Sequence, residues 1–244
     1  MNAFQRRLLA FWADAAERWE ALRAPVARET GLLVWNPQRY GLEVYARFAE
    51  RHLPRAPGAL LMLGLNPGKY GMSQTGVPFT DVTRARTLGI GFDLDAPGLA
   101  PPDLRPFLKP YRVERSSQSV YAFLQLAHGS VEAGWRDVWA MSPCGLLFLE
   151  PDGTNVTPAD ARLARREDVR ALRLRVMEEA ARLAKPRGVV LLGQDVAKVA
   201  RGAGLGDAPR VVADHPVARG PGRRGPAWWA EDVARRLREA RLLG

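Results

Sequence analysis

Four short apolar segments, separated by stretches of helical pattern, most constrain how this chain of 244 residues can fold. They are 59–65 (ALLMLGL), 137–149 (DVWAMSPCGLLFL, interrupted at Ser142 and Pro143), 188–193 (GVVLLG) and 210–216 (RVVADHP). Near-continuous apolar runs of this length are typical of strands covered on both faces, as in a parallel sheet. The chain is therefore predicted to be α/β, with right-handed crossovers between its strands.

The segments between the strands carry helical spacing. Apolar residues recur at three- and four-residue steps over 3–24. Further helices are predicted at 41–53, 118–128, 160–184, 194–201 and 226–243. The stretch 66–117 is rich in glycine and proline, and long irregular regions in compact domains are commonly functional or disordered. No repeat or linker divides the chain, so we expect one domain over 1–244, with 1–30 as an N-terminal helical extension.

The charge balance points to a polyanionic partner. The net charge is +10 and the sequence pI is about 10.5, which in a protein without a membrane segment favours nucleic acid. A compositional bias toward arginine is the alternative explanation. No apolar run reaches the roughly 18–20 residues that cross a membrane, and the first residues lack a signal peptide's apolar core. We therefore expect a cytoplasmic protein without membrane contact.

Cysteine and histidine are too few for most metal sites. Cys144 is alone, which excludes an internal disulfide, a four-cysteine cluster and a cysteine-built zinc site. The three histidines, His52, His128 and His215, have no metal-binding spacing. We expect neither a metal nor a cofactor.

Two side chains suited to chemistry follow the predicted strands. In open α/β sheets, ligands bind at the carboxyl ends of the strands. Asn66 follows the first apolar run and His215 lies at the end of the last. These two residues are the first candidates for a site.

The stretch Leu61–Phe79 (LMLGLNPGKYGMSQTGVPF) superficially resembles a phosphate-binding loop. A Walker A loop needs Gly-x-x-x-x-Gly-Lys-Ser/Thr. The spacing from Gly64 to Gly68 is one residue short, and Tyr70 replaces the required hydroxyl residue. A dinucleotide-binding Gly-x-Gly-x-x-Gly is also absent. We reject both nucleotide-binding interpretations.

The same stretch closely resembles the first active-site motif of the single-strand-selective monofunctional uracil-DNA glycosylases. Residues 215–225 (HPVARGPGRRG) resemble the second motif, and 146–159 (LLFLEPDGTNVTPA) resemble a further segment of that family. Their order and spacing agree with the family from about residue 35 to the end of the chain. The resemblance implies a bacterial member of the uracil-DNA glycosylase superfamily, a three-layer α/β/α fold and a central four-stranded parallel sheet.

The resemblance also implies a monofunctional DNA glycosylase of base-excision repair. Such an enzyme excises uracil, and in this family related bases such as 5-hydroxymethyluracil, from single- or double-stranded DNA. We expect it to act as a monomer, without cofactor, on the bacterial nucleoid. Base excision requires extrusion of the base, stabilisation of the departing anion and a positioned water molecule.

The resemblance assigns roles residue by residue. Asn66 matches the asparagine that positions the attacking water, and His215 the histidine that donates a hydrogen bond to the uracil O2. Phe79 matches the phenylalanine that stacks on the extruded base. Gly68 and Met72 match positions that shape the pocket near the base C5. The remaining pocket residues implied by the motif are Gly64, Leu65, Pro67, Tyr70 and Ser142.

The DNA-contacting residues are implied with less chemical detail. Arg219, Arg223 and Arg224 match the segment that enters the duplex near the lesion, where they can bind phosphates or fill the vacated stack. Lys69 replaces a family proline. It is expected to contact phosphate or solvent, and the alternative is a Schiff base that would cleave the strand.

Ser142 is the main departure from the family pattern. It stands where the family has an asparagine that reads the uracil edge, and a serine cannot make that paired contact. Base choice can therefore be looser, or a water can fill the gap. Two alternatives stay open: a glycosylase shifted to another deaminated base, such as hypoxanthine or xanthine, and a non-catalytic protein that binds damaged DNA.

Overall fold

A four-stranded parallel sheet forms the centre of the fold in the computed structural model, which describes residues 1–91, 98–108, 113–217 and 225–243. The strand order is β3-β2-β6-β7. The strands are β2 (Leu60–Leu63), β3 (Val138–Met141), β6 (Gly188–Leu192) and β7 (Arg210–Ala213). The predicted parallel sheet is confirmed, and its apolar sequence has a direct cause: every residue of β2, β3 and β6 is buried.

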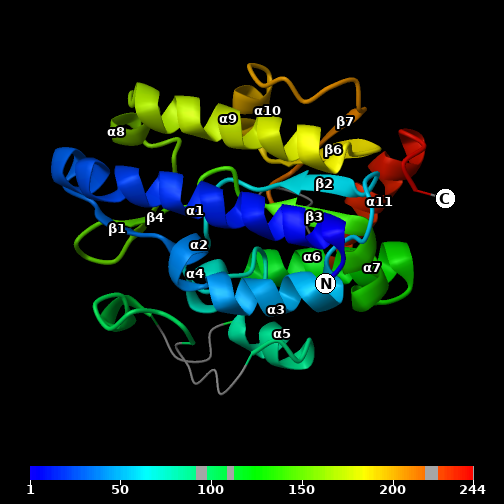
Figure 1. Cartoon of the computed structure of the whole chain (residues 1–244), viewed down its shortest axis with the longest axis horizontal. Helices are drawn as coiled ribbons and strands as arrows, with labels where there is room; N and C mark the ends of the chain where they lie inside the picture. Colours follow the sequence, from blue (N-terminus) through cyan, green and yellow to red (C-terminus); the bar gives the residue numbers. More distant parts are fainter. Residues whose placement is uncertain (92–97, 109–112, 218–224, 244) are drawn as a thin grey trace.

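Helices cover both faces of this sheet (Figure 1). In Figure 1, α1 and α9 lie side by side over the near face, and α6 and α11 lie behind it. The longer helices are α1 (Ala3–Thr30), α3 (Leu42–His52), α6 (Arg115–His128), α7 (Val131–Asp137), α9 (Glu167–Ala184), α10 (Gln194–Ala200) and α11 (Pro226–Glu239). Among the described residues, no helix is long and apolar enough to cross a lipid bilayer.

A second, antiparallel sheet was not predicted. It contains β1 (Leu33–Trp35), β4 (Leu147–Leu149) and β5 (Asn155–Val156), in that order. The apolar run 137–149 therefore supplies two strands to two different sheets, because the chain turns at Ser142 and Pro143 between them. A second turn, at residues 150–154, then leads from β4 into β5.

Several predicted helix boundaries were wrong. α1 continues past Pro25 to Thr30, where Gly31 ends it in the left-handed conformation. The predicted helix 160–184 is divided into α8 (Ala161–Ala164) and α9. The glycine- and proline-rich stretch contains short helices α4 (Met72–Thr75), α5 (Val82–Thr87) and the 3₁₀-helix η1 (Arg105–Phe107).

The segment after β2, residues 66–80, is held tightly against α2 (Pro37–Tyr40) and the residue that follows it. A Cβ atom at Gly41 would lie 2.2 Å from the Gly76 Cα, so two glycines are required where these backbones meet. The Tyr40 hydroxyl donates a hydrogen bond of 2.5 Å to the Ser73 carbonyl oxygen. We call residues 66–80 the pocket loop.

Replacing Gly76 by alanine should destabilise the protein through two separable effects. Gly76 has a φ of 72°, and an added Cβ would lie 2.5 Å from the Gly41 Cα. Gly31 has a similar φ of 70° with nothing within 4 Å of its would-be Cβ. We expect Gly31→Ala to cost about 1 kcal/mol from backbone strain alone and Gly76→Ala to cost at least about 1 kcal/mol more. Urea unfolding measures both, and equal losses would contradict the close packing of the pocket loop.

Candidate active site

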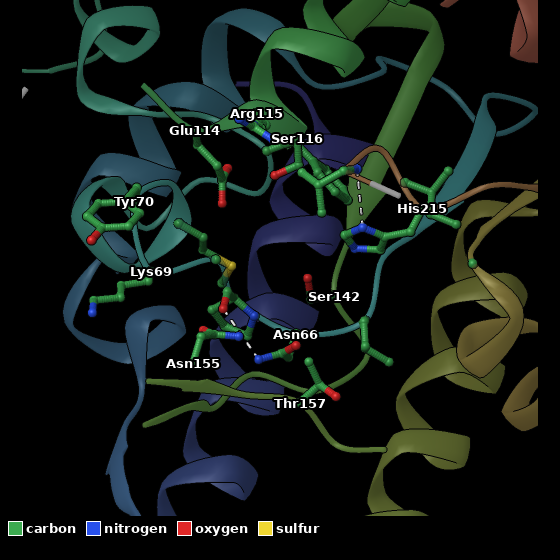
Figure 2. Close-up of a pocket in the computed structure, with 18 of the residues that line it drawn as sticks. Asn66, Lys69, Tyr70, Glu114, Arg115, Ser116, Ser142, Asn155, Thr157 and His215 are labelled. Carbon is green, nitrogen blue, oxygen red and sulfur yellow. Dashed lines mark hydrogen bonds between the residues drawn. The ribbon is translucent and has the colours of Figure 1, made fainter. Parts of the chain in front are cut away.

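A cavity of about 680 Å³ lies at the carboxyl ends of all four parallel strands (Figure 2). The pocket loop, the residues after β3 and β6, His215 and the start of α6 line it. The structure brings together in this cavity most of the residues predicted for the site, namely Leu65, Asn66, Pro67, Gly68, Lys69, Tyr70, Met72, Phe79, Ser142 and His215. Ten predicted residues, from several separate segments of the chain, thus line the same cavity.

Asn66 is half-buried at the first turn after β2. Its Nδ2 donates a long hydrogen bond of 3.4 Å to the Pro67 carbonyl oxygen. No donor among the described residues reaches its amide oxygen. That oxygen is therefore free to accept a hydrogen bond from a water molecule or a ligand in the cavity.

The hydrogen bonding of His215 fixes its tautomer. The Val217 backbone N–H donates to Nδ1 over 3.4 Å, so in the neutral ring the proton lies on Nε2. Burial lowers the pKa of His215, and Asp195 opposes that shift. Neutral imidazole with a free Nε2–H is a hydrogen-bond donor that adds no full charge to the cavity.

The backbone that carries His215 is anchored to two helices. Ser119 on α6 donates its hydroxyl to the Pro216 carbonyl oxygen at 3.0 Å. The indole of Trp229 on α11 donates to the Asp214 carbonyl oxygen at 2.8 Å. Trp229 is buried in the core. These contacts fix the direction of the imidazole.

Phe79 and Gly64 depend on each other. A Cβ at position 64 would lie 2.6 Å from the Phe79 Cζ, so the ring packs directly on the glycine that ends β2. Phe79 itself has a φ of 53°, a left-handed conformation that is costly for a non-glycine residue and recurs at functional sites. Gly64 therefore contributes to the pocket as the support for the aromatic wall.

Glu114 is a pocket residue that the sequence did not indicate. Its carboxyl oxygens lie where Cβ atoms of Gly68 and Gly71 would be, at 1.6 and 2.0 Å respectively. Burial raises the pKa of Glu114 to about 7, and the charge of Asp81 adds to the rise. The Ser116 hydroxyl and Arg84 oppose it. A carboxyl group that is partly protonated near neutral pH thus borders the predicted base pocket (Figure 2).

Asp81 positions Glu114. The buried Asp81 carboxylate pairs with Arg84 at 2.6 Å and accepts the Glu114 backbone N–H at 3.3 Å and the Ser117 hydroxyl at 2.5 Å. It also accepts from the Arg84 backbone N–H as the N-cap of α5. One carboxylate therefore joins α5 to the start of α6.

Lys69 contacts the antiparallel sheet. Its ammonium donates a hydrogen bond of 2.7 Å to the Gly153 carbonyl oxygen, in the turn between β4 and β5. It also lies 5.6 Å from the centroid of the Tyr70 ring. The predicted phosphate contact stays a prediction, and the structure adds a second role, which is to hold the pocket loop against β5.

Ser142 is buried at the end of β3, and Asn155 and Thr157 face it across the cavity floor around Asn66 (Figure 2). The Asn155 side chain is exposed and has no hydrogen bond with a described residue. Asn155 was not among the residues predicted for the pocket, because it matches a different asparagine of the family, and the structure places it in the cavity lining. A free amide therefore lies on the cavity wall near Ser142, the position where the resemblance predicts that a base-reading asparagine is missing.

Three predicted DNA contacts, Arg219, Arg223 and Arg224, lie outside the described residues. Further lining residues that the sequence did not indicate are Val113, Arg115, Ser116, Leu192, Gly193, Gln194, Asp195 and Val217. For Leu192 to Asp195 a signal existed, since they follow an apolar run whose carboxyl end faces the site. The residues at the start of α6 had none, because a contact made across distant segments leaves no local pattern.

No family model matches the chain, but similar proteins share most of its length. The single-strand selective monofunctional uracil-DNA glycosylase of Rattus norvegicus is 33% identical over 220 residues, which cover 86% of this chain and 77% of that protein. The protein of the same name from Bos taurus is 32% identical over 217 residues, covering 86% and 78%. The chain belongs to the single-strand selective monofunctional uracil-DNA glycosylase family. Members of this family are hydrolases of N-glycosyl bonds, and the chain is therefore an enzyme of this class.

A solved structure supports the fold of this family member. The crystal structure of Pedobacter heparinus SMUG2 superimposes with a TM-score of 0.67 at 20% identity, covering 86% of this chain and 89% of that one. The predicted three-layer α/β/α fold with a four-stranded parallel sheet is confirmed. At this identity the likeness concerns the fold alone.

The Glu114 carboxyl should make the stability of this glycosylase depend on pH. Its pKa rises on folding from an ordinary value of 4.5 to about 7. The folded state therefore holds the proton more tightly than the unfolded state. Burial of this carboxyl leaves the free energy of unfolding unchanged below about pH 4.5, where the group is protonated in both states, and lowers it most above pH 7. Relative to the native protein, Glu114→Gln should gain stability as pH rises through this window, by about 1–3 kcal/mol in total.

Urea unfolding at intervals from acidic to alkaline pH measures this gain. Glu231→Gln is the matched control, because Glu231 is an exposed carboxylate on α11. It should leave the shape of the pH profile unchanged. If the Glu114→Gln and native profiles run parallel, the carboxyl is not buried as the structure shows.

Proposed function

We propose that this chain excises uracil from DNA by hydrolysing the N-glycosidic bond during base-excision repair. The observation that carries the proposal is that the free amide oxygen of Asn66 and the Nε2–H of a neutral His215 share one cavity with the ring of Phe79. These are the groups needed to place a water molecule, stabilise a departing base anion and stack on an extruded base. The names of the relatives agree with uracil as the base.

Because Asn66 is not a strong base, bond cleavage must precede the attack of water. An amide oxygen accepts a hydrogen bond from water but cannot remove its proton at neutral pH. The bond to the base must therefore break well before the water attacks. His215 lowers the barrier to that break by donating from Nε2 to the uracil O2 as negative charge grows there. Asn66 then holds the water molecule that adds to the oxocarbenium-like sugar, and the proton that this water loses passes to the departed uracil anion or to solvent.

The proposal extends to 5-hydroxymethyluracil. The wall at Gly68 has no side chain, and the carboxyl group of Glu114 lies directly against it. A hydroxymethyl group on the base C5 finds both space and a hydrogen-bond partner at such a wall. A purely apolar wall would admit the group without compensating its lost water contacts.

Replacing His215 should remove most catalysis while leaving the fold intact. We expect His215→Ala to lower the single-turnover rate on uracil-containing single strands by about 10²–10³-fold, the range for losing one preorganised donor. Alkaline cleavage of the abasic product on a denaturing gel measures the rate. His128→Ala is the control, since His128 lies outside the cavity lining, and it should retain activity. A His215→Ala variant as fast as the native enzyme would overturn the proposed role.

The pH profile adds a second test of the same histidine. Because burial lowers the pKa of His215, the ring stays neutral below the ordinary histidine pKa of about 6.5. The His215-dependent part of the rate should therefore persist as pH falls through that value.

The buried Ser142 favours a second candidate, a glycosylase of relaxed base choice. Ser142→Asn would restore a paired donor and acceptor at this position, and should raise the preference for uracil over xanthine or hypoxanthine by about tenfold or more in kcat/KM. Ser142→Ala is the control, because it removes the hydroxyl without adding an amide. The assay uses single- and double-stranded oligonucleotides carrying each base. Equal preferences in both variants would exclude this position from base reading, and no product from any substrate would favour a non-catalytic damage-binding protein.

A further inference from the structure

A second cavity of about 320 Å³ lies between α9, α10 and the segment around α8. α9 and α10 are neighbours in Figure 1, on the side of the sheet near β6. Aliphatic side chains form most of the lining, and the charged members are Arg170, Arg173, Asp195 and Lys198. Asp195 also lines the base cavity, so the two spaces are separated by the residues that follow β6. We call this second space the α9–α10 cavity.

Arg173 is the unusual member of this lining. Only 6% of the residue is exposed, and its Nε and Nη2 are buried with no hydrogen-bond partner among the described residues. A guanidinium remains protonated even where burial lowers its pKa, as it does here. A buried charge without a partner is strongly destabilising. The fold therefore carries a cation whose hydrogen-bonding capacity is unused.

The carboxylate in the cavity lining, Asp195, does not neutralise Arg173. Asp195 attracts the guanidinium electrostatically, but it is exposed and makes no salt bridge to it within 4.0 Å. The half-buried arginines among the described residues, by contrast, are paired. Arg18 binds Glu179 through two hydrogen bonds, of 3.1 and 2.6 Å, and Arg187 binds Asp137 in the same two-point manner. The missing carboxylate at Arg173 is thus a local exception.

The other charges of the cavity reinforce a positive potential. Lys198 is exposed on α10 and forms no ion pair with a described residue. Arg170 pairs with Glu167 at 2.6 Å on the surface of α9, where such pairs are worth little. Three cationic side chains therefore share the lining with a single carboxylate. A concave, largely apolar space with convergent cations is suited to an anion.

We propose that the α9–α10 cavity binds a phosphate oxyanion, with the Arg173 guanidinium as its main ligand and Lys198 at its mouth. A guanidinium cation attracts a phosphate oxyanion and donates hydrogen bonds to it, which would offset the buried charge that the protein leaves unpaired. A phosphate oxyanion can reach a basic, DNA-acting protein from two sources. The oxyanion is either free inorganic phosphate or a phosphodiester of a DNA strand that passes this side of the molecule.

Titration of the full-length protein with inorganic phosphate in a phosphate-free buffer tests the site. Calorimetry should show saturable binding to the native protein, and Arg173→Met should weaken it by about tenfold or more. Lys198→Met should weaken it by less. Arg182→Met, an exposed arginine on the same helix, is the matched control and should bind like the native protein. Phosphate should also raise the unfolding temperature of the native protein and not that of Arg173→Met.

Two further results decide the proposal and its source. Arg173→Met should fold, because it removes an unpaired buried charge. If it does not fold, Arg173→Lys is the second variant, since it keeps the positive charge but loses the planar guanidinium group. If an undamaged single-stranded oligonucleotide displaces phosphate from the native protein, and Arg173→Met abolishes this competition, the DNA backbone is the source of the oxyanion. Phosphate binding without competition identifies the free ion. Native-like phosphate binding by Arg173→Met, or no saturable binding by the native protein, would overturn the site.

Discussion

The complete burial of β2 is the constraint on which the rest of the molecule depends. None of its four residues is accessible to solvent, because β3 and β6 flank it in the sheet and helices cover both faces. A strand with no exposed face cannot slip in register without placing polar groups in the core. The chain must therefore leave the sheet at Gly64, where the Phe79 ring already occupies the space of a side chain. The position of Asn66 follows from that exit.

Glu114 and His215, two titratable side chains of the site, are shifted in opposite directions by the same cause. Burial lowers the pKa of His215 and raises that of Glu114, so each group is biased toward its neutral form. A cavity of this kind suits a reaction in which a neutral base enters and an anion departs. A full negative charge on Glu114 would oppose the departure, and a permanent positive charge on His215 would have to be desolvated before any substrate arrived. Directed dipoles stabilise the anion only when it forms.

The apolar runs were sufficient to predict the central sheet, and the strand ends together with the family resemblance were sufficient for much of the site. Continuous apolar runs mark strands of a parallel sheet, and the carboxyl ends of such strands converge, so Asn66 and His215 were expected to meet. The resemblance, and not the strand pattern, implied pocket roles for Phe79 and Ser142. The antiparallel sheet escaped prediction because β1 has three residues and β4 is merged with β3 in one apolar run. Glu114 escaped because its placement depends on Asp81, far away in the sequence. Short strands and long-range polar contacts leave no periodic trace.

The helix α1 belongs to the folded core, although it lies outside the part of the chain that carries the family motifs. The family motifs begin after residue 30, yet α1 contributes the fully buried Trp12 and Trp19 to the core, and the Trp12 indole stacks on Tyr45 at 3.9 Å. Arg18 ties the same helix to Glu179 on α9. A chain trimmed to the part that resembles its relatives would lose these two indoles and expose the apolar side chains that they cover, Tyr45 among them. An exposed apolar patch of this kind favours aggregation. The part of the chain that carries the family motifs is therefore shorter than the unit that must fold together.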